Sequence, residues 1–312
     1  MSSHTETETV IVGAGPAGLT AALALARYRH RVIVVDSHHA PRNSASQGAH
    51  GHIGMDAATP ADMRALAGKE LSRYATVELR EAHADSVRAA DGGRFRVVLD
   101  GGDTVDASAV VLATGVIDVH PAHVEGFSAC WGRSVIHCPF CLGEENADRR
   151  WGIVVDNADL AALSPVAFRA WTGDTVAVCP ASMPGVDGAR TAARARGGDL
   201  VTGTISRLHH RRGSLYAVEF DDGRVLERDT LVWTPRQRQQ PVVARAIEEL
   251  GVAVDADGFV GVDADRCTSV PGLYAAGDLT SRWKQSVTAS VAAGAAVADA
   301  IHVAEVQRAA LS

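Results

Sequence analysis

The chain has 312 residues, which is long enough for two domains or for one domain interrupted by another. Hydrophobic residues make up 46% and charged residues 21%, as in an ordinary globular protein, so extensive disorder is not expected. With 30 Lys and Arg against 37 Asp and Glu, the formal net charge is −7, which gives no electrostatic basis for binding nucleic acid or an anionic membrane.

The first nine residues are polar and acidic, and the apolar run after them is interrupted by glycines. This pattern is typical of neither a signal peptide nor a membrane anchor. No stretch approaches the roughly 18 uninterrupted apolar residues that a membrane helix needs. Five cysteines without an even framework fit a reducing compartment. We therefore expect a cytoplasmic protein without a membrane partner.

A glycine-rich turn lies between a strand and a helix near the start of the chain. Val10–Val12 is apolar, Gly13–Gly18 reads Gly-Ala-Gly-Pro-Ala-Gly, and an alanine- and leucine-rich helix runs to about Arg29. A second strand, Val32–Val35, ends at Asp36, near the spacing at which a dinucleotide fold needs an acid for a ribose hydroxyl. With strand, helix and acid in place, we favour a dinucleotide site over a purely structural glycine turn.

The three glycines of this turn have different expected roles. Gly13 permits the tight turn, Gly15 lets the backbone approach a pyrophosphate, and Gly18 lets helix and strand pack closely. The phosphates would rest on the N-terminal end of the helix.

Two histidines, His50 and His52, lie in a loop at 41–54 that is rich in Gly, Ser and His. Alternating histidines can bind metal, but the local spacing suggests no further ligand, so we expect a loop over the cofactor and no metal site. An amphipathic helix is expected at 61–74. Short strands with Asp-Gly-Gly turns follow from 77 to 112 and end at Ala113-Thr114-Gly115.

The remainder of this nucleotide fold is expected near the other end of the chain. A strand at 272–276 runs into Gly277-Asp278, and an alanine-rich helix is expected from about Gln285 to Val303. Between the two halves lies an insert at about 119–240, with its own βαβ-like start at 152–155 and a strand-rich section around 216–220. The sequence therefore predicts an α/β protein in which one domain interrupts another.

The segment His137-Cys138-Pro139-Phe140-Cys141 places two cysteines within one helical turn. At a helix N-terminus the dipole favours thiolate, so one sulfur can attack and the other can resolve. The alternatives are half of a four-cysteine zinc site or two unrelated buried cysteines. The other cysteines, Cys130, Cys179 and Cys267, are single and complete no second pair, which favours a redox pair.

Together these motifs resemble the FAD-dependent pyridine nucleotide-disulfide oxidoreductases of the low-molecular-weight thioredoxin reductase type, over essentially the whole chain. The resemblance implies a homodimer with two Rossmann-like, three-layer ββα nucleotide-binding domains, the second inserted in the first. It implies an FAD-binding domain at 1–118 and 241–312, and an NADPH-domain-like region at 119–240 that carries the Cys-x-x-Cys. The FAD-binding residues that it implies are Gly13, Gly15, Pro16, Ala17, Gly18, Asp36, Ser37, Arg42, Asn43, Ala113, Thr114, Gly115, Gly277, Asp278 and Gln285.

Three further segments are similar to the dithiol oxidases of gliotoxin, holomycin and romidepsin biosynthesis: Pro41-Arg42-Asn43, the His-Gly pairs at 50–54, and Trp131-Gly132-Arg133 before the cysteines. In that branch a small-molecule dithiol natural product is closed to a disulfide, and reduced flavin passes electrons to O2, giving H2O2. The family order implies that Cys138 meets the substrate and Cys141 faces the flavin.

One departure from the family concerns the second nucleotide site. Thioredoxin reductases have a second G-x-G-x-x-A/G loop there, followed by a His-Arg-Arg-type cluster for the NADPH 2′-phosphate. Here the loop at 155–160 reads Val-Asp-Asn-Ala-Asp-Leu, and the first basic residue after the next strand is Arg190. Side chains block close approach of the backbone, and Asp156 and Asp159 repel phosphate. We expect NADPH binding to be lost; a divergent mode of NADPH binding is the alternative.

A second departure is Leu142, which follows the redox pair where thioredoxin reductases place an acid and many of the dithiol oxidases a histidine. The proton relay must use another group. His137 is the first choice because it adjoins Cys138 and histidine titrates near neutrality, although it can equally cap or pack beside the motif. The other candidates are Glu144, Glu145, His50 and His52.

Three functions are compatible with these features. The leading one is an FAD-dependent dithiol oxidase that uses Cys138, Cys141 and O2. The second is a reductase of thioredoxin or another disulfide, driven by NADPH or ferredoxin. The third is a flavin-binding or redox-sensing interaction protein with little turnover, which the intact Cys-x-x-Cys disfavours.

Overall fold

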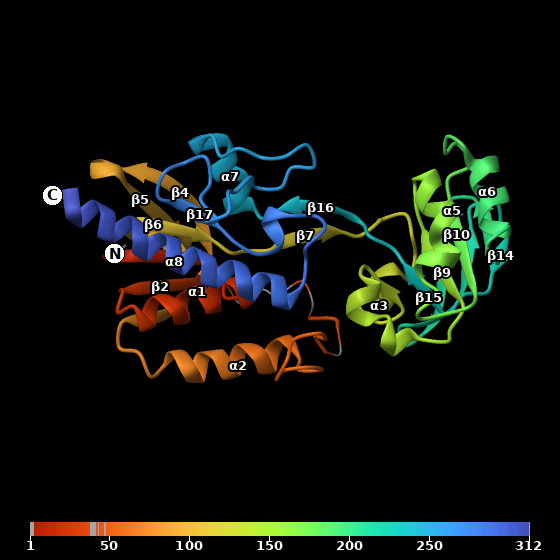
Figure 1. The fold of residues 1–312 in the computed structure, drawn as a ribbon, viewed down its shortest axis with the longest axis horizontal. Coiled ribbons are helices and arrows are strands. Elements are labelled where there is room, and N and C mark those ends of the chain that lie inside the picture. The colour runs from red at the N-terminus through yellow and green to blue at the C-terminus, as the bar shows by residue number, and fades with distance from the viewer. Residues whose placement is uncertain (1–2, 38–41, 43, 47, 312) are drawn as a thin grey trace. The chain divides into compact units, whose positions relative to one another are not determined.

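The computed structural model describes residues 3–37, 42, 44–46 and 48–311. The chain divides into two compact units (Figure 1), one made of Met1–Arg42, Gly51–Ile117 and Gln237–Ser312 and the other of Asn43–His50 and Asp118–Arg236. The long segment of the second unit, 118–236, begins one residue before the expected insert, 119–240, and ends four residues before the end of that insert. The short segment at 43–50 groups with the second unit, which the sequence did not indicate.

The first unit is built on a seven-stranded sheet in the order β3-β2-β1-β6-β5-β4, with β17 also paired to β6. In β6 the residues near its start pair antiparallel with β5, whereas its last three pair parallel with β17. This strand therefore joins a parallel sheet to an antiparallel meander. The strands are β1 His4–Val12, β2 Val32–Asp36, β3 Val77–Glu81, β4 Ala84–Ala90, β5 Arg94–Leu99, β6 Thr104–Leu112 and β17 Leu273–Ala275.

Helices and the meander bury both faces of the parallel sheet. In β1, Val10 and Val12 point into a core shared with helix α7, Pro241–Leu250. Ile11 points into a core shared with helices α1, Pro16–Arg27, and α8, Val287–Leu311. This alternation follows from the two-residue period of a strand. Burial on both faces explains why these strands read as continuous apolar runs. Helix α2, Pro60–Leu71, completes the unit.

Two elements are longer than the sequence predicts. Strand β1 begins at His4, where the prediction began at Val10, because its polar first half is held by a ladder to β6 that carries no apolar signal. Helix α8 spans Val287–Leu311, where 285–303 was expected, because its final exposed turns are rich in helix-forming residues.

By length and composition alone, α8 could cross a membrane. One such helix is weak evidence, since core helices of soluble proteins pass the same test. Its buried residues belong to the core shared with α1, and a Cβ on Gly294 would lie 2.2 Å from the Ala17 carbonyl oxygen. We therefore interpret α8 as a core helix.

The second unit contains a five-stranded parallel sheet in the order β11-β10-β9-β15-β8 and a three-stranded antiparallel sheet. Where the chain passes between the units, β7, Val116–Val119, pairs with β16, Arg236–Gln239. The other strands are β8 Val135–Ile136, β9 Trp151–Val154, β10 Thr175–Cys179, β11 Asp199–Thr202, β12 Ile205–Arg211, β13 Ser214–Phe220, β14 Val225–Leu226 and β15 Thr230–Val232. The helices are α3 Phe127–Cys130, α4 Pro139–Leu142, α5 Ala158–Ala167 and α6 Val186–Arg194.

Candidate functional site

The glycine turn leaves the N-terminus of α1 open. A Cβ on Gly13 would lie 2.5 Å from the Ala113 carbonyl oxygen, and one on Gly18 would lie 2.0 Å from the Gly13 oxygen, so neither position accepts a side chain. A Cβ on Gly15 would meet nothing closer than 4.0 Å. Gly15 is the N-cap and no side chain caps the helix, so the first backbone N–H groups of α1, after Pro16, remain available to an anion. These features fit the pyrophosphate of a dinucleotide.

The crossover residues and Gly277 lie against this turn. Ala113, Thr114 and Gly115 follow β6 directly, and the Ala113 N–H donates to the last residue of β1 at 2.8 Å. Gly277 has φ +92°, and a Cβ there would lie 3.2 Å from the Ala17 Cβ. The structure thus brings together three motifs that are far apart in the sequence, as a single FAD site requires.

Asp36 ends β2 and is followed by the half-buried Ser37. Its Oδ1 accepts from the Ala14 N–H at 2.9 Å, so the carboxylate anchors the glycine turn. Its Oδ2 is paired with Arg64 of α2, a partner that the sequence did not reveal. An acid that is fixed in this way next to the turn is suitably placed for a ribose hydroxyl.

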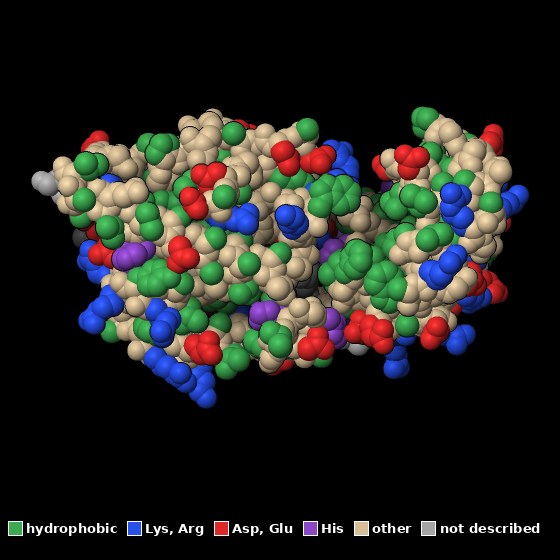
Figure 2. Space-filling view, in the orientation of Figure 1, with side chains coloured by type: hydrophobic (Ala, Val, Ile, Leu, Met, Phe, Trp, Pro, Cys, Tyr) green, Lys and Arg blue, Asp and Glu red, His purple; other side chains and the backbone are tan. Residues whose placement is uncertain are grey.

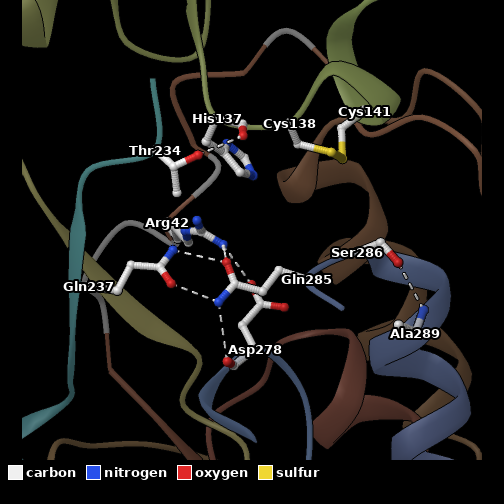
Figure 3. Close-up of a disulfide and its surroundings, with 10 residues drawn as sticks. All are labelled: Arg42, His137, Cys138, Cys141, Thr234, Gln237, Asp278, Gln285, Ser286 and Ala289. Carbon is white, nitrogen blue, oxygen red and sulfur yellow. Dashed lines mark hydrogen bonds and ion pairs between the residues drawn. A yellow bond between two sulfur atoms is a disulfide. The ribbon is translucent and has the colours of Figure 1, made fainter. Parts of the chain in front are cut away.

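A half-buried polar network precedes α8 (Figure 3). The Arg42 guanidinium donates to Asp278 Oδ2 at 3.0 Å and to Gln285 Oε1 at 2.8 Å. Gln285 and Gln237 exchange two amide hydrogen bonds, both 2.9 Å long. The Gln285 amide nitrogen also lies 3.0 Å from the Ser281 carbonyl oxygen. Protein groups therefore hold the Gln285 side chain, which makes it a positioning group in front of α8. Asn43, another expected FAD ligand, lies outside the described residues.

In the second unit the two cysteines form a disulfide (Figure 3). Cys138 is the N-cap of the short helix α4, and the Cys138 and Cys141 Cα atoms are 5.3 Å apart. Both cysteines are half-buried, and Cys141 packs against the core cluster of this unit. Pairing with each other excludes the zinc-site alternative for the oxidised form. The reactive bond is thus partly accessible to a thiol.

The other three cysteines are poor nucleophiles. Burial raises the pKa of the Cys130 and Cys179 thiols. Burial, followed by the charges of Asp263 and Asp265, raises the pKa of the Cys267 thiol. A thiol reacts as its thiolate, so a raised pKa makes these groups less reactive.

Leu142 points into the core. It is 9% exposed and packs in the cluster that contains Trp151, and its carbonyl accepts from the buried Asn146 amide at 2.9 Å. An ionisable side chain here would have to be buried among apolar groups, which costs free energy. Leu142 is therefore a packing residue, and proton transfer needs another group, as the sequence predicts.

Two histidines of this unit have defined partners. The His137 ring stacks on Trp131, with ring centroids 5.8 Å apart, and its carbonyl accepts from Thr234 Oγ1 at 3.2 Å (Figure 3). His50 Nε2 lies 3.3 Å from a carboxylate oxygen of Glu145, four residues after Cys141. A carboxylate beside an imidazole orients the ring. His50 is thereby strengthened as a candidate base.

The N-terminus of α5 differs from that of α1. Asn157 is its N-cap, and the Asn157 side-chain oxygen accepts from the Leu160 N–H at 3.0 Å, the interaction that a phosphate would have to replace. Asp159 lies in the first turn. Arg190 is engaged by Asp187 at 3.0 Å and by the Leu200 carbonyl oxygen at 3.4 Å.

No group of three or more His, Cys, Asp or Glu side chains in the described part of the chain is placed to hold a metal ion. On the face visible in Figure 2, acidic and basic side chains are both distributed over the surface. Neither observation suggests a metal centre or a nucleic-acid interface.

The chain belongs to the pyridine nucleotide-disulphide oxidoreductase family, whose model matches residues 7–202 and 187–294. It is 31% identical to the thioredoxin reductase tcpT of Claviceps purpurea (strain 20.1) over 302 residues, which cover 89% of this chain and 88% of the relative. The crystal structure of HlmI is similar with 32% identity and a TM-score of 0.83, covering 98% of this chain and 96% of that one. An oxidoreductase from Agrobacterium tumefaciens has 28% identity and a TM-score of 0.85, covering 97% and 99%.

These similarities confirm the α/β fold with two Rossmann-like domains and the resemblance to thioredoxin reductases. Proteins of this family are oxidoreductases and flavoproteins that typically hold FAD. The protein is therefore a thioredoxin reductase-like disulfide oxidoreductase.

Proposed function

We propose that this protein is an FAD-dependent dithiol oxidase that closes a disulfide in a small-molecule natural-product dithiol and uses O2 as electron acceptor. The contrast between two helix N-termini carries the proposal. At α1, Gly15 leaves the backbone N–H groups open, whereas at α5 the Asn157 side chain caps them and Asp159 adds negative charge. A capped, acidic α5 N-terminus disfavours NADPH, so in this proposal the electrons enter from the substrate thiols.

The substrate dithiol and the Cys138–Cys141 pair react by thiol–disulfide exchange. A substrate thiolate attacks Cys138 Sγ, the Cys138–Cys141 bond breaks, and Cys141 leaves as a thiolate. The second substrate thiol then attacks the sulfur joined to Cys138, so the product disulfide forms and both cysteines are reduced. Bound FAD supplies the two-electron acceptor for the reduced pair and the route to O2, which yields one H2O2 for each disulfide.

The chain's own groups bind and orient the FAD. The open α1 N-terminus and Gly15 would hold the pyrophosphate, Asp36 the adenosine ribose, and Asp278 the ribityl chain. Arg42 and Gln285 fix Asp278 and the segment before α8. We also propose the homodimer that the resemblance implies, and a cytoplasmic location.

The test is oxygen consumption by the purified FAD-loaded protein with a dithiol. We expect O2 uptake with equal amounts of H2O2 and product disulfide, and no uptake with a monothiol at the same thiol concentration, because ring closure needs two thiols on one molecule. Disulfide formation without O2 uptake or peroxide would contradict the oxidase assignment.

The substrate thiols need a general base to become thiolates. Substitution of His137 and of His50 shows which of the two histidines is that base. We expect His137→Gln to lower kcat/KM for the dithiol by about 10²-fold, the usual contribution of a general base. His50→Gln is the comparison, with Glu145→Gln as its partner variant. The measurement is kcat/KM against pH for each variant. If His50→Gln and Glu145→Gln lose the acidic limb of the profile and His137→Gln keeps it, the base is the His50–Glu145 pair.

The second candidate function is a disulfide reductase driven by NADPH or ferredoxin. It is favoured by the relative from Claviceps purpurea, which is named a thioredoxin reductase. Reduction of thioredoxin by the purified protein with either donor would support it.

A further inference from the structure

An exposed aromatic side chain lies between the two reactive cysteines in the sequence. Phe140 precedes Cys141 in the chain, and its side chain is 85% exposed, although phenylalanine is normally buried. The ring meets Trp171 edge to face, with centroids 5.5 Å apart and planes at 80°. Phe140 and Trp171 form an aromatic corner beside the disulfide.

The aromatic corner is held rigidly by the elements that carry the disulfide. Trp171 stacks on the buried Trp151, with centroids 6.0 Å apart and planes at 13°. A Cβ on Gly143 would lie 2.6 Å from Trp171 Nε1, so a glycine after α4 allows the indole to lie directly against this turn. The Trp171 carbonyl also accepts from the Asp148 N–H at 2.8 Å. The Trp171 side of the corner is therefore fixed before a ligand binds.

The geometry of the corner matches a flat ring. Aromatic pairs favour offset-stacked and edge-to-face arrangements. The planes of Phe140 and Trp171 are 80° apart, so a ligand ring that stacks on one of these side chains is nearly perpendicular to the other. The pair therefore offers a stacked and an edge-to-face contact to the same ligand ring.

We infer that Phe140 and Trp171 select dithiols in which an aromatic ring lies within a few bonds of the sulfur atoms. The tether must be short because Phe140 is adjacent to Cys141 and two residues from Cys138. This specificity rests on the proposed dithiol oxidation and adds the substrate class to it.

The test compares three dithiols with wild type and Phe140→Ala: 1,2-benzenedimethanethiol, 1,2-cyclohexanedimethanethiol and dithiothreitol. For the benzene compound we expect kcat/KM to fall about 10- to 100-fold in the variant, mainly through KM, because apolar burial and ring pairing are lost. The cyclohexane compound should lose less, and dithiothreitol should change within about twofold. Phe140→Tyr should retain the preference, and Tyr216→Ala, which removes a half-exposed ring elsewhere in this unit, should leave it unchanged.

A binding measurement separates this inference from the oxidase proposal. The dithioether 1,2-bis(methylthiomethyl)benzene undergoes no disulfide exchange, so its Kd reports recognition alone. We expect it to bind wild type at least about 10-fold more tightly than Phe140→Ala. Equal Kd values, or an equal loss of kcat/KM for all three dithiols, would overturn the inference. If the dithioether binds selectively but no dithiol is oxidised, the oxidase proposal fails and the aromatic selectivity stands.

Discussion

Cys138→Ser is expected to lower kcat for dithiol oxidation by about 10³-fold or more while FAD stays bound. The variant has no disulfide for a substrate thiol to attack, and serine neither forms one nor replaces the thiolate. H2O2 release with 1,2-benzenedimethanethiol measures the loss, and the visible absorbance of the flavin measures its retention. Cys179→Ser is the matched control, since Cys179 is buried and outside the disulfide, and it should oxidise the dithiol at the wild-type rate.

The companion variant Cys141→Ser distinguishes the roles of the two sulfurs. When it is mixed with the product disulfide, Cys138 should open that disulfide and form a mixed disulfide that the introduced serine has no means to resolve, and the protein mass should rise by one molecule of the disulfide. In Cys138→Ser we expect little trapping, because Cys141 packs against the core. Preferential trapping on Cys141 would reverse the assigned roles.

NADPH is expected to leave the flavin oxidised under anaerobic conditions, whereas the dithiol bleaches it. The Asn157 side chain already occupies the α5 N-terminus and Asp159 opposes phosphate, so the pyrophosphate has neither open N–H groups nor a favourable charge. Stopped-flow measurement of the flavin absorbance should show reduction by NADPH at least about 10³-fold slower than by the dithiol, equivalent to about 4 kcal/mol.

Addition of the dithiol to the same anaerobic sample is the control, because it shows that the flavin is reducible. Asn157→Ala separates the cap from the charges. Loss of the cap should destabilise α5 by about 1 kcal/mol, and NADPH should still leave the flavin oxidised because the repulsion by the carboxylates remains. Rapid bleaching of the wild type by NADPH would overturn the oxidase proposal and favour the reductase.

Local patterns explain why the glycine turn and its neighbouring acid were predictable. The turn Gly13–Gly18 and Asp36 lie within one βαβ unit, so residue spacing alone predicts that they meet. The Cys138–Cys141 pair is likewise local. By contrast, Arg64 reaches Asp36, and Gln237 reaches Gln285, through contacts between distant segments that have no sequence signature.

Lengths of elements were less predictable than their existence. The polar start of β1 forms a strand because β6 supplies hydrogen-bond partners along it, and no apolar alternation marks that extension. The last turns of α8 are exposed, so only the helix propensity of their residues favours a helix there, and the prediction ended at 303.

The sequence by itself determined the α/β class, the family, the glycine turn at 13–18 and the lack of glycine at 155–160, because these depend on residue types at short, regular spacing. Only the tertiary structure decided how the side chains around the cysteines are used. It buries Leu142, pairs His50 with Glu145, and places Trp171 against Phe140. These contacts join segments separated by many residues, and packing of the whole unit, which no local pattern encodes, brings them together.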